Sequence, residues 1–150
     1  FGLSEWAWTV FHMNAGPVPE PDLSAEQNIW TVLTELHKNG GLASCSAVGT
    51  GGVLGTLLTA AVRQSAGIAW SNAGQELSLH TLCSEGQTGV LVTLRDTAQS
   101  RALLEKSASE RNLMAVPLGR LIPENVLTDD AALWQAAHAS FKDALKPFFK

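Results

Sequence analysis

The spacing of hydrophobic positions alternates along the chain between a helical period and short continuous apolar runs. The helical period predicts five amphipathic helices, the second ending at Gly40 and the third spanning residues 52–65. Apolar runs predict strands that start at Leu42 and cover residues 67–70, 89–94 and 113–121. This alternation predicts an α/β or α+β fold, a two-layer sandwich with helices packed on a small mixed sheet. The pattern leaves parallel and antiparallel strand pairing open.

Polar residues beside these runs mark the expected helix starts. The second helix is preceded by the capping box Ser24-Ala25-Glu26-Gln27, and Trp30 lies on its apolar stripe. Trp134 lies on the stripe of the last helix, so both tryptophans are expected in the core. Residues 71–87 are mostly polar and predict turns. The residues expected to cap helices are Ser4, Ser24, Asp96 and Thr128.

Pro117 interrupts the fourth predicted strand. Proline has no backbone N–H to donate to a ladder, so this strand is expected at a sheet edge or a bulge. An open edge is a natural docking site for another chain. Val116 and Leu118 are therefore candidate partner-binding residues, with the alternative that both are core. Asp129 and Asp130 are second candidates, because exposed acids speed association with basic partners; otherwise they only stabilise a helix start.

Residues 44–52 form a glycine-rich loop between the first predicted strand and the third helix. Glycine lets a ligand approach the backbone, and amides at a helix N-terminus favour an anion. This segment nevertheless contains no Asp, Glu, His, Lys or Arg. The backbone of a ligand-binding loop is thus present without ionisable side chains. Its candidate residues are Ser46, Gly49, Thr50, Gly51 and Gly52.

Composition limits the classes of function. The 150 residues are the size of one domain, taken here as residues 1–150 of a longer chain. Charged residues make up only 16%, below the roughly 25% of ordinary domains, so a partner or flanking domain is expected to cover part of the surface. A net charge of −4 argues against direct nucleic-acid binding. No apolar run reaches the roughly 18 residues of a membrane span.

Cofactor and metal chemistry lack a matching motif. Gly49, Gly51 and Gly55 give G-x-G-x-x-x-G, which differs from the dinucleotide fingerprint, and no Walker lysine follows. The four histidines are far apart, and Cys45 and Cys83 have no metal-ligand spacing. Both cysteines lie in apolar surroundings and are expected to be buried, as in a reduced intracellular protein. We therefore expect no metal, no cofactor and no catalytic residue.

The order of motifs nevertheless resembles the synthetase domains of formylglycinamidine ribonucleotide synthase and aminoimidazole ribonucleotide synthase. The similarity spans nearly the whole chain and implies their PurM-like C-terminal sandwich fold. Segments similar to that family are Gly2-Leu3-Ser4, Pro19-Glu20-Pro21-Asp22-Leu23, Leu82-Cys83-Ser84-Glu85, Leu118-Gly119-Arg120-Leu121 and the closing helix from Leu133 to Leu145. From the residues alone, Ser84-Glu85 is either a solvated turn or the remnant of a site.

The family's hallmark is His-Asp-Val-Ser-Asp-Gly-Gly-Leu at the glycine loop. The same eight positions here read Ser46-Ala47-Val48-Gly49-Thr50-Gly51-Gly52-Val53. The hydrophobic and glycine positions match, whereas the histidine and both aspartates are replaced. A fold can persist after its chemistry is lost, because packing and catalysis depend on different residues. The resemblance therefore implies a pseudoenzyme.

Degenerate copies of this synthetase occur as large tegument proteins of gammaherpesviruses such as Epstein–Barr virus, and this chain resembles that group. Members are associated with host nuclear-body proteins, among them the histone chaperone DAXX. The resemblance implies a domain of the virion tegument and the host nucleus that binds DAXX, with or without histones, and displaces ATRX. One alternative is the nucleotide-binding domain of a divergent purine-biosynthesis synthase. Another is a structural module with neither activity.

Overall fold

The computed structural model describes residues 4–13, 16, 20–64, 66–86, 88–123, 136 and 139. The chain divides into two compact units. The first consists of residues 1–56 and 79–116, and the second of residues 57–78 and 117–150. Both contain helices and antiparallel strands, which confirms the predicted α+β class. The single-domain expectation and the synthetase-like sandwich remain predictions.

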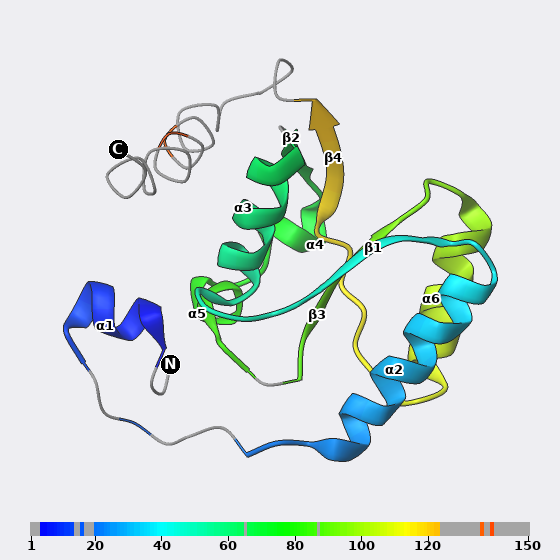
Figure 1. Ribbon diagram of the computed structural model, residues 1–150, viewed down its shortest axis with the longest axis horizontal. Coiled ribbons are helices and arrows are strands. Elements are labelled where there is room, and N and C mark those ends of the chain that lie inside the picture. The colour runs from blue at the N-terminus through cyan, green and yellow to red at the C-terminus, as the bar shows by residue number, and fades with distance from the viewer. Residues whose placement is uncertain are drawn as a thin grey trace, which may run out of the picture. The chain divides into compact units, whose positions relative to one another are not determined.

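The first unit contains a two-stranded antiparallel sheet and most of the helices (Figure 1). Strands β1 and β3 pair from Ala47 opposite Val90 to Ser44 opposite Thr93, and the register shifts between Leu42 and Ser44. This shift is typical of a β-bulge. The elements are α1 (Glu5–Phe11), α2 (Leu23–Lys38), β1 (Leu42–Ala47), the start of α3 (Gly52–Gln64), α5 (Leu79–Cys83), β3 (Val90–Leu94) and α6 (Ala98–Ser109).

The second unit contains the rest of α3, β2 (Ala66–Trp70), α4 (Asn72–Gln75) and β4 (Gly119–Pro123). Strands β2 and β4 pair antiparallel, from Ala66 opposite Pro123 to Trp70 opposite Gly119. The described strands therefore form two separate antiparallel sheets rather than the mixed sheet expected from the sequence. The buried apolar residues of the second unit are Leu57, Ala61, Val62 and Ile68.

Helix α2 begins one residue before the predicted capping box. Asp22 has an extended backbone, and its Oδ1 accepts a hydrogen bond of 2.9 Å from the amide of Ala25. This is the N-cap geometry, so the prediction that Ser24 caps the helix was wrong. The helix ends at Lys38, as the Gly40-Gly41 pair predicted.

Helix α2 buries one face against its own unit and exposes the other. Val32, Leu33 and Leu36 are buried, with Leu36 completely inaccessible. Trp30 is 68% exposed, so its assignment to the core was wrong. It lies three positions from Leu33, about 60° around the helix from the buried stripe, and its large ring extends outward. Trp134 lies outside the described residues.

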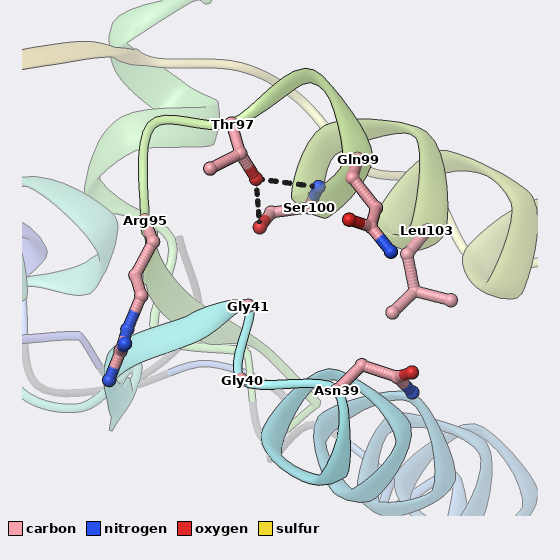
Figure 2. A pocket seen from close by; sticks show the side chains of 8 residues that line it. All are labelled: Asn39, Gly40, Gly41, Arg95, Thr97, Gln99, Ser100 and Leu103. Atoms are coloured by element: carbon pink, nitrogen blue, oxygen red, sulfur yellow. Dashed lines mark hydrogen bonds between the residues drawn. The ribbon is translucent and has the colours of Figure 1, made fainter.

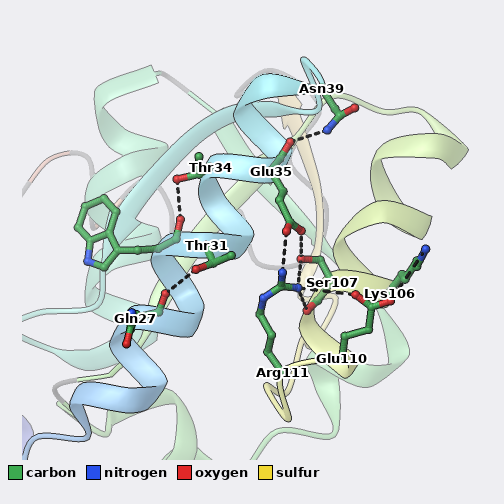
Figure 3. A network of polar contacts seen from close by, with 10 residues as sticks. Gln27, Thr31, Thr34, Glu35, Asn39, Lys106, Ser107, Glu110 and Arg111 are labelled. Carbon is green, nitrogen blue, oxygen red and sulfur yellow. Dashed lines mark hydrogen bonds and ion pairs between the residues drawn. The ribbon is translucent and has the colours of Figure 1, made fainter.

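Polar contacts join α2 to α6 and the residues that follow it (Figure 3). Glu35 accepts a hydrogen bond from the hydroxyl of Ser107, and its other oxygen lies 2.6 Å from the Arg111 guanidinium. Arg111 also donates to the Ser107 hydroxyl at 2.9 Å. Since Ser107 is only 2% exposed, this network satisfies a polar group inside the helix pair.

Three further sequence expectations differ from the structure. Helix α6 is capped by Thr97, whose hydroxyl accepts from the Ser100 amide, whereas Asp96 pairs with Arg101. The last described strand begins at Gly119, so residues 113–118 are not part of it. The region expected to form turns contains the short helices α4 and α5. The caps of α6 at Thr97 and of α4 at Ser71 are local hydrogen bonds that hydrophobic spacing does not reveal.

Among the described residues, none of the helices combines the length and apolar character needed to cross a membrane. The predicted cap Thr128 lies outside the described part of the chain.

Replacing Leu36 by alanine should lower the free energy of unfolding by about 2–5 kcal/mol, since a fully buried leucine leaves a cavity. Leu23→Ala is the matched control on the same helix, because Leu23 is 71% exposed and its loss should change stability by at most about 0.5 kcal/mol. Urea denaturation of both variants tests this expectation. Equal losses would show that α2 does not bury the predicted face.

Candidate functional site

The glycine loop turns the chain sharply from β1 into α3. Gly51 and Gly52 have φ angles of +79° and +68°, a left-handed conformation that other residues adopt at a cost. The amide of Gly52 donates to the carbonyl of Gly49 at 2.9 Å, which closes the turn. The turn chemistry predicted from the glycines is therefore present at these two positions.

Gly52 also allows a close contact between two backbone segments. A Cβ built on Gly52 would lie 2.7 Å from the carbonyl oxygen of Leu82 and 2.7 Å from the carbonyl carbon of Cys83. Both distances are shorter than real Cβ contacts allow. Glycine at this position thus lets the end of α5 lie directly against the loop.

Thr56 closes the loop from the helix side. Its hydroxyl donates to the carbonyl of Gly52 at 2.9 Å and accepts from the amide of Gly49 at 3.3 Å. Two of the loop's backbone groups are therefore satisfied by a side chain one turn into α3. Ser46 and Thr50, the hydroxyl residues predicted to belong to a ligand site, are exposed.

Glu85 supplies the negative charge that the loop's own sequence lacks. Its Oε1 accepts a hydrogen bond of 2.8 Å from the Gly51 amide and another of 2.8 Å from the Glu5 amide. Glu5 is the first residue of α1, whose N-cap, Ser4, is buried and accepts from Ala7. One carboxylate thus joins three segments that are separate in the sequence. Glu85 is therefore bonded within the first unit, and both interpretations of Ser84-Glu85 stay open.

The chemistry of this cluster is that of an anion site filled by the protein itself. The Gly51 amide, which could otherwise bind a phosphate or carboxylate, donates to Glu85. An incoming anion would have to displace that carboxylate and would meet its negative charge. The described residues contain no cluster of His, Cys, Asp and Glu able to hold a metal ion.

The two cysteines differ in environment. Cys83, beside the loop, is 3% exposed, and burial raises the pKa of its thiol, which keeps it protonated at neutral pH. Cys45 is exposed on β1, so the prediction that both cysteines are buried was wrong for Cys45. Its side chain stands on a strand whose last five residues are all exposed.

A shallow hollow of about 250 Å³ lies between the end of α2 and the start of α6 (Figure 2). The hydroxyls of Thr97 and Ser100 lie 2.6 Å apart and bond to each other. The volume is below the roughly 300 Å³ at which ligand pockets begin. The lining residues are Asn39, Gly40, Gly41, Arg95, Thr97, Gln99, Ser100 and Leu103.

The predicted partner-binding residues are distributed over different parts of the chain. Val116 is half-buried in the first unit, and Leu118 is half-buried in the second. Within the second unit, the Leu118 carbonyl accepts from the Ser71 amide at 2.9 Å, and the Pro117 carbonyl accepts from the Ser71 hydroxyl. Pro117 therefore precedes strand β4 and does not interrupt its ladder. Asp129 and Asp130 lie outside the described residues.

Sequence reasoning missed the exposed face of α2. Trp30 lies there with Gln27, Thr31, Thr34 and Lys38, which together form an open surface along one helix. With Thr31 included, these polar residues recur at spacings of four, three and four, a helical signal that could have placed Trp30 outside the core to which the apolar stripe assigned it.

No protein-family model matches the chain, and no curated protein matches it either. The family resemblance therefore remains a prediction based on the quoted motifs.

Gly52→Ala should destabilise the protein by about 3 kcal/mol or more, because it combines a positive φ with contacts too short for a Cβ. Gly49→Ala is the matched control in the same loop. Nothing lies within 4 Å of a Cβ built at Gly49, so its stability should be unchanged or up to about 1 kcal/mol higher. Thermal and urea unfolding measure both effects. Comparable stabilities would contradict the close packing of the loop on α5.

Glu85→Ala should speed hydrogen exchange at the Gly51 and Glu5 amides and reduce stability by about 1–2 kcal/mol, since both donors lose their acceptor. Glu85→Gln keeps an oxygen acceptor and should retain most of the protection. Amide-resolved hydrogen exchange distinguishes the two variants. Unchanged exchange at both amides in Glu85→Ala would mean that the carboxylate does not hold the loop.

Proposed function

We propose that this chain is a non-catalytic domain that binds a host nuclear-body protein, the histone chaperone DAXX, with or without its histone cargo. Binding would displace ATRX and counter the repression of viral chromatin. The choice of partner rests on the resemblance to gammaherpesvirus tegument proteins. Action in the virion tegument and in host nuclear bodies belongs to the same proposal.

The bond from the Gly51 amide to Glu85 is the observation that supports a non-catalytic domain most directly. In a nucleotide-binding loop, backbone amides at the turn into a helix face the ligand, whereas here the Gly51 amide faces an internal carboxylate. Residues 44–52 also contribute no acid, base or cation. The loop therefore acts as a structural joint between β1, α3 and α1.

The exposed face of α2 is the part of the first unit best suited to a protein partner. Trp30 is 68% exposed on a sixteen-residue helix and stands on an open surface with Gln27, Thr31 and Thr34. Tryptophan is enriched among the few residues that carry most binding energy in interfaces. We assign Trp30 as the principal contact on this face, ahead of Val116 and Leu118.

The first experiment is size-exclusion chromatography of the chain with the DAXX histone-binding domain, with and without histones H3 and H4, followed by calorimetry. Trp30→Ala should weaken binding roughly thirtyfold, about 2 kcal/mol, with an unchanged unfolding midpoint. Trp8→Ala is the matched control, because Trp8 is 50% exposed on a different helix. Equal affinity of both variants would remove the α2 face from the interface. A loss confined to Val116→Ala or Leu118→Ala would move the interface to those residues.

A nucleotide titration tests the alternative function. The unmodified chain should give no heat with ATP, because Glu85 occupies the Gly51 amide and no cation in the loop attracts phosphate. Glu85→Gln should also give none, because the glutamine oxygen can still accept from that amide and the loop still has no cation. Saturable ATP binding, combined with separate elution from DAXX, would favour a divergent purine-pathway domain. Neither activity would favour a structural module.

A further inference from the structure

Strand β1 has an open edge among the described residues. It pairs with β3 on one side, and no other described strand pairs with it. All five residues from Ala43 to Ala47 are exposed, so neither face of this stretch is covered. Unpaired strand edges present N–H and C=O groups to any chain that can add a strand.

The alternation of hydrogen-bonded and non-bonded pairs in the β1–β3 ladder identifies which residues direct their backbone N–H and C=O groups toward the open edge. The Val48 amide donates to the carbonyl of Gly89, which continues the register of Ala47 opposite Val90. Bonded and non-bonded pairs alternate in an antiparallel ladder, so Ser46 and Ser44 also bond toward β3. Cys45 and Ala47 consequently direct their backbone N–H and C=O groups away from β3.

The sequence of this edge is a palindrome. Ala43-Ser44-Cys45-Ser46-Ala47 has the same order in both directions, with Cys45 at its centre. In a two-fold antiparallel pair centred on Cys45, Ala43 faces Ala47 and Ser44 faces Ser46 of the second copy. Every side chain then meets one of equal size, and the serines lie close enough for cross-strand hydrogen bonds.

Natural edge strands are usually protected by charges, by proline or by a bulge. No charged residue and no proline occurs from Asn39 to Val62, so two copies with a net charge of −4 each would bring no charge to this line of contact. A bulge between Leu42 and Ser44 leaves Ala43 out of the β1–β3 register, and by the two-fold symmetry it limits the pairing at both ends of the short ladder. The edge is therefore open at Cys45 and Ala47.

We propose that β1 is a self-association edge, at which two copies of this chain pair antiparallel about a two-fold axis through Cys45. An unrelated extended segment could use the same backbone groups, but it would not require the palindrome. The contact of a single short strand is smaller than a standard interface of about 1,600 Å². The association is accordingly weak and reversible, and it depends on protein concentration.

The register gives a direct chemical test. Opposed residues in a bonded antiparallel pair have Cα atoms about 5.5 Å apart, within the range that a disulfide spans. Mild oxidation with diamide should link Cys45 to Cys45 of a second copy and leave the buried Cys83 unlinked, as read by peptide mapping. Loss of the linked product on dilution, together with concentration-dependent sedimentation, is expected.

Two chains that each carry one exposed cysteine beside the buried Cys83 test the alignment more sharply. One carries Cys45→Ser with Ala43→Cys, and the other carries Cys45→Ser with Ala47→Cys. The proposed register places these new thiols opposite each other, so the mixture should link at least about tenfold faster than either chain alone. Linkage at equal rates in the mixture and in the separate chains would reject the register.

Ala47→Pro tests the contribution of the backbone. It removes a donor that faces the open edge and leaves the bonds of Ser44 and Ser46 to β3 in place. Two hydrogen bonds are lost per symmetric pair, so self-association should weaken about tenfold or more. Ala47→Lys is the second variant if the proline impairs folding. Unchanged linkage in a folded variant would identify random collision and overturn the proposal.

If the DAXX domain, rather than a second copy of this chain, binds the β1 edge, the same variants give a different result. A chain that is monomeric at every concentration, but whose binding to the DAXX domain is abolished by Ala47→Pro, would overturn self-association and assign the edge to that partner. Self-association that persists when DAXX binding is absent would support this proposal and reject the proposed function. The two failures are therefore distinguishable.

Discussion

The approach of Gly52 to the backbone of Leu82 and Cys83 is the constraint on which the organisation of the first unit depends. A side chain at this position would lie 2.7 Å from the Leu82 carbonyl oxygen, so only glycine allows the loop to contact α5. The contact fixes the end of α5, and Glu85 follows two residues later. The carboxylate of Glu85 then lies within hydrogen-bond distance of the amides of Gly51 and Glu5. A steric condition at one glycine thus determines where a charge is placed.

The position of Glu85 indicates a structural role for the glycine loop. In a binding site, backbone amides at a turn into a helix are free to bind an external anion. Here an internal carboxylate occupies one of them, and the same carboxylate lies at the positive N-terminal end of α1. The Glu85 carboxylate thus holds segments of the first unit together through two backbone amides. The loop has no ionisable side chain of its own, and the carboxylate that accepts from its Gly51 amide comes from Glu85 in another segment.

The low charge content predicted a surface suited to contacts, and two exposed features have that character. Trp30 on α2 is a large, exposed aromatic side chain, whereas β1 presents backbone groups and small side chains. The two surfaces differ in the forces they offer: apolar area in the first and directional hydrogen bonds in the second. Both come from segments whose other side is engaged within the first unit, by Leu36 and by the pairing with β3 respectively.

The sequence by itself determined the helices α2 and α3, the strands β1, β2 and β3, and the turn chemistry of the glycine loop. Hydrophobic period and glycine conformational freedom are local properties, so they can be read from neighbouring residues. The caps of α2 and α6 at Asp22 and Thr97 are local hydrogen bonds that the hydrophobic period does not reveal. Tertiary structure decided the antiparallel pairing of strands distant in sequence and the exposure of Trp30 and Cys45. It also decided that Glu85 lies at Gly51, thirty-four positions away. No local pattern encodes this contact, because it depends on the path of the intervening chain.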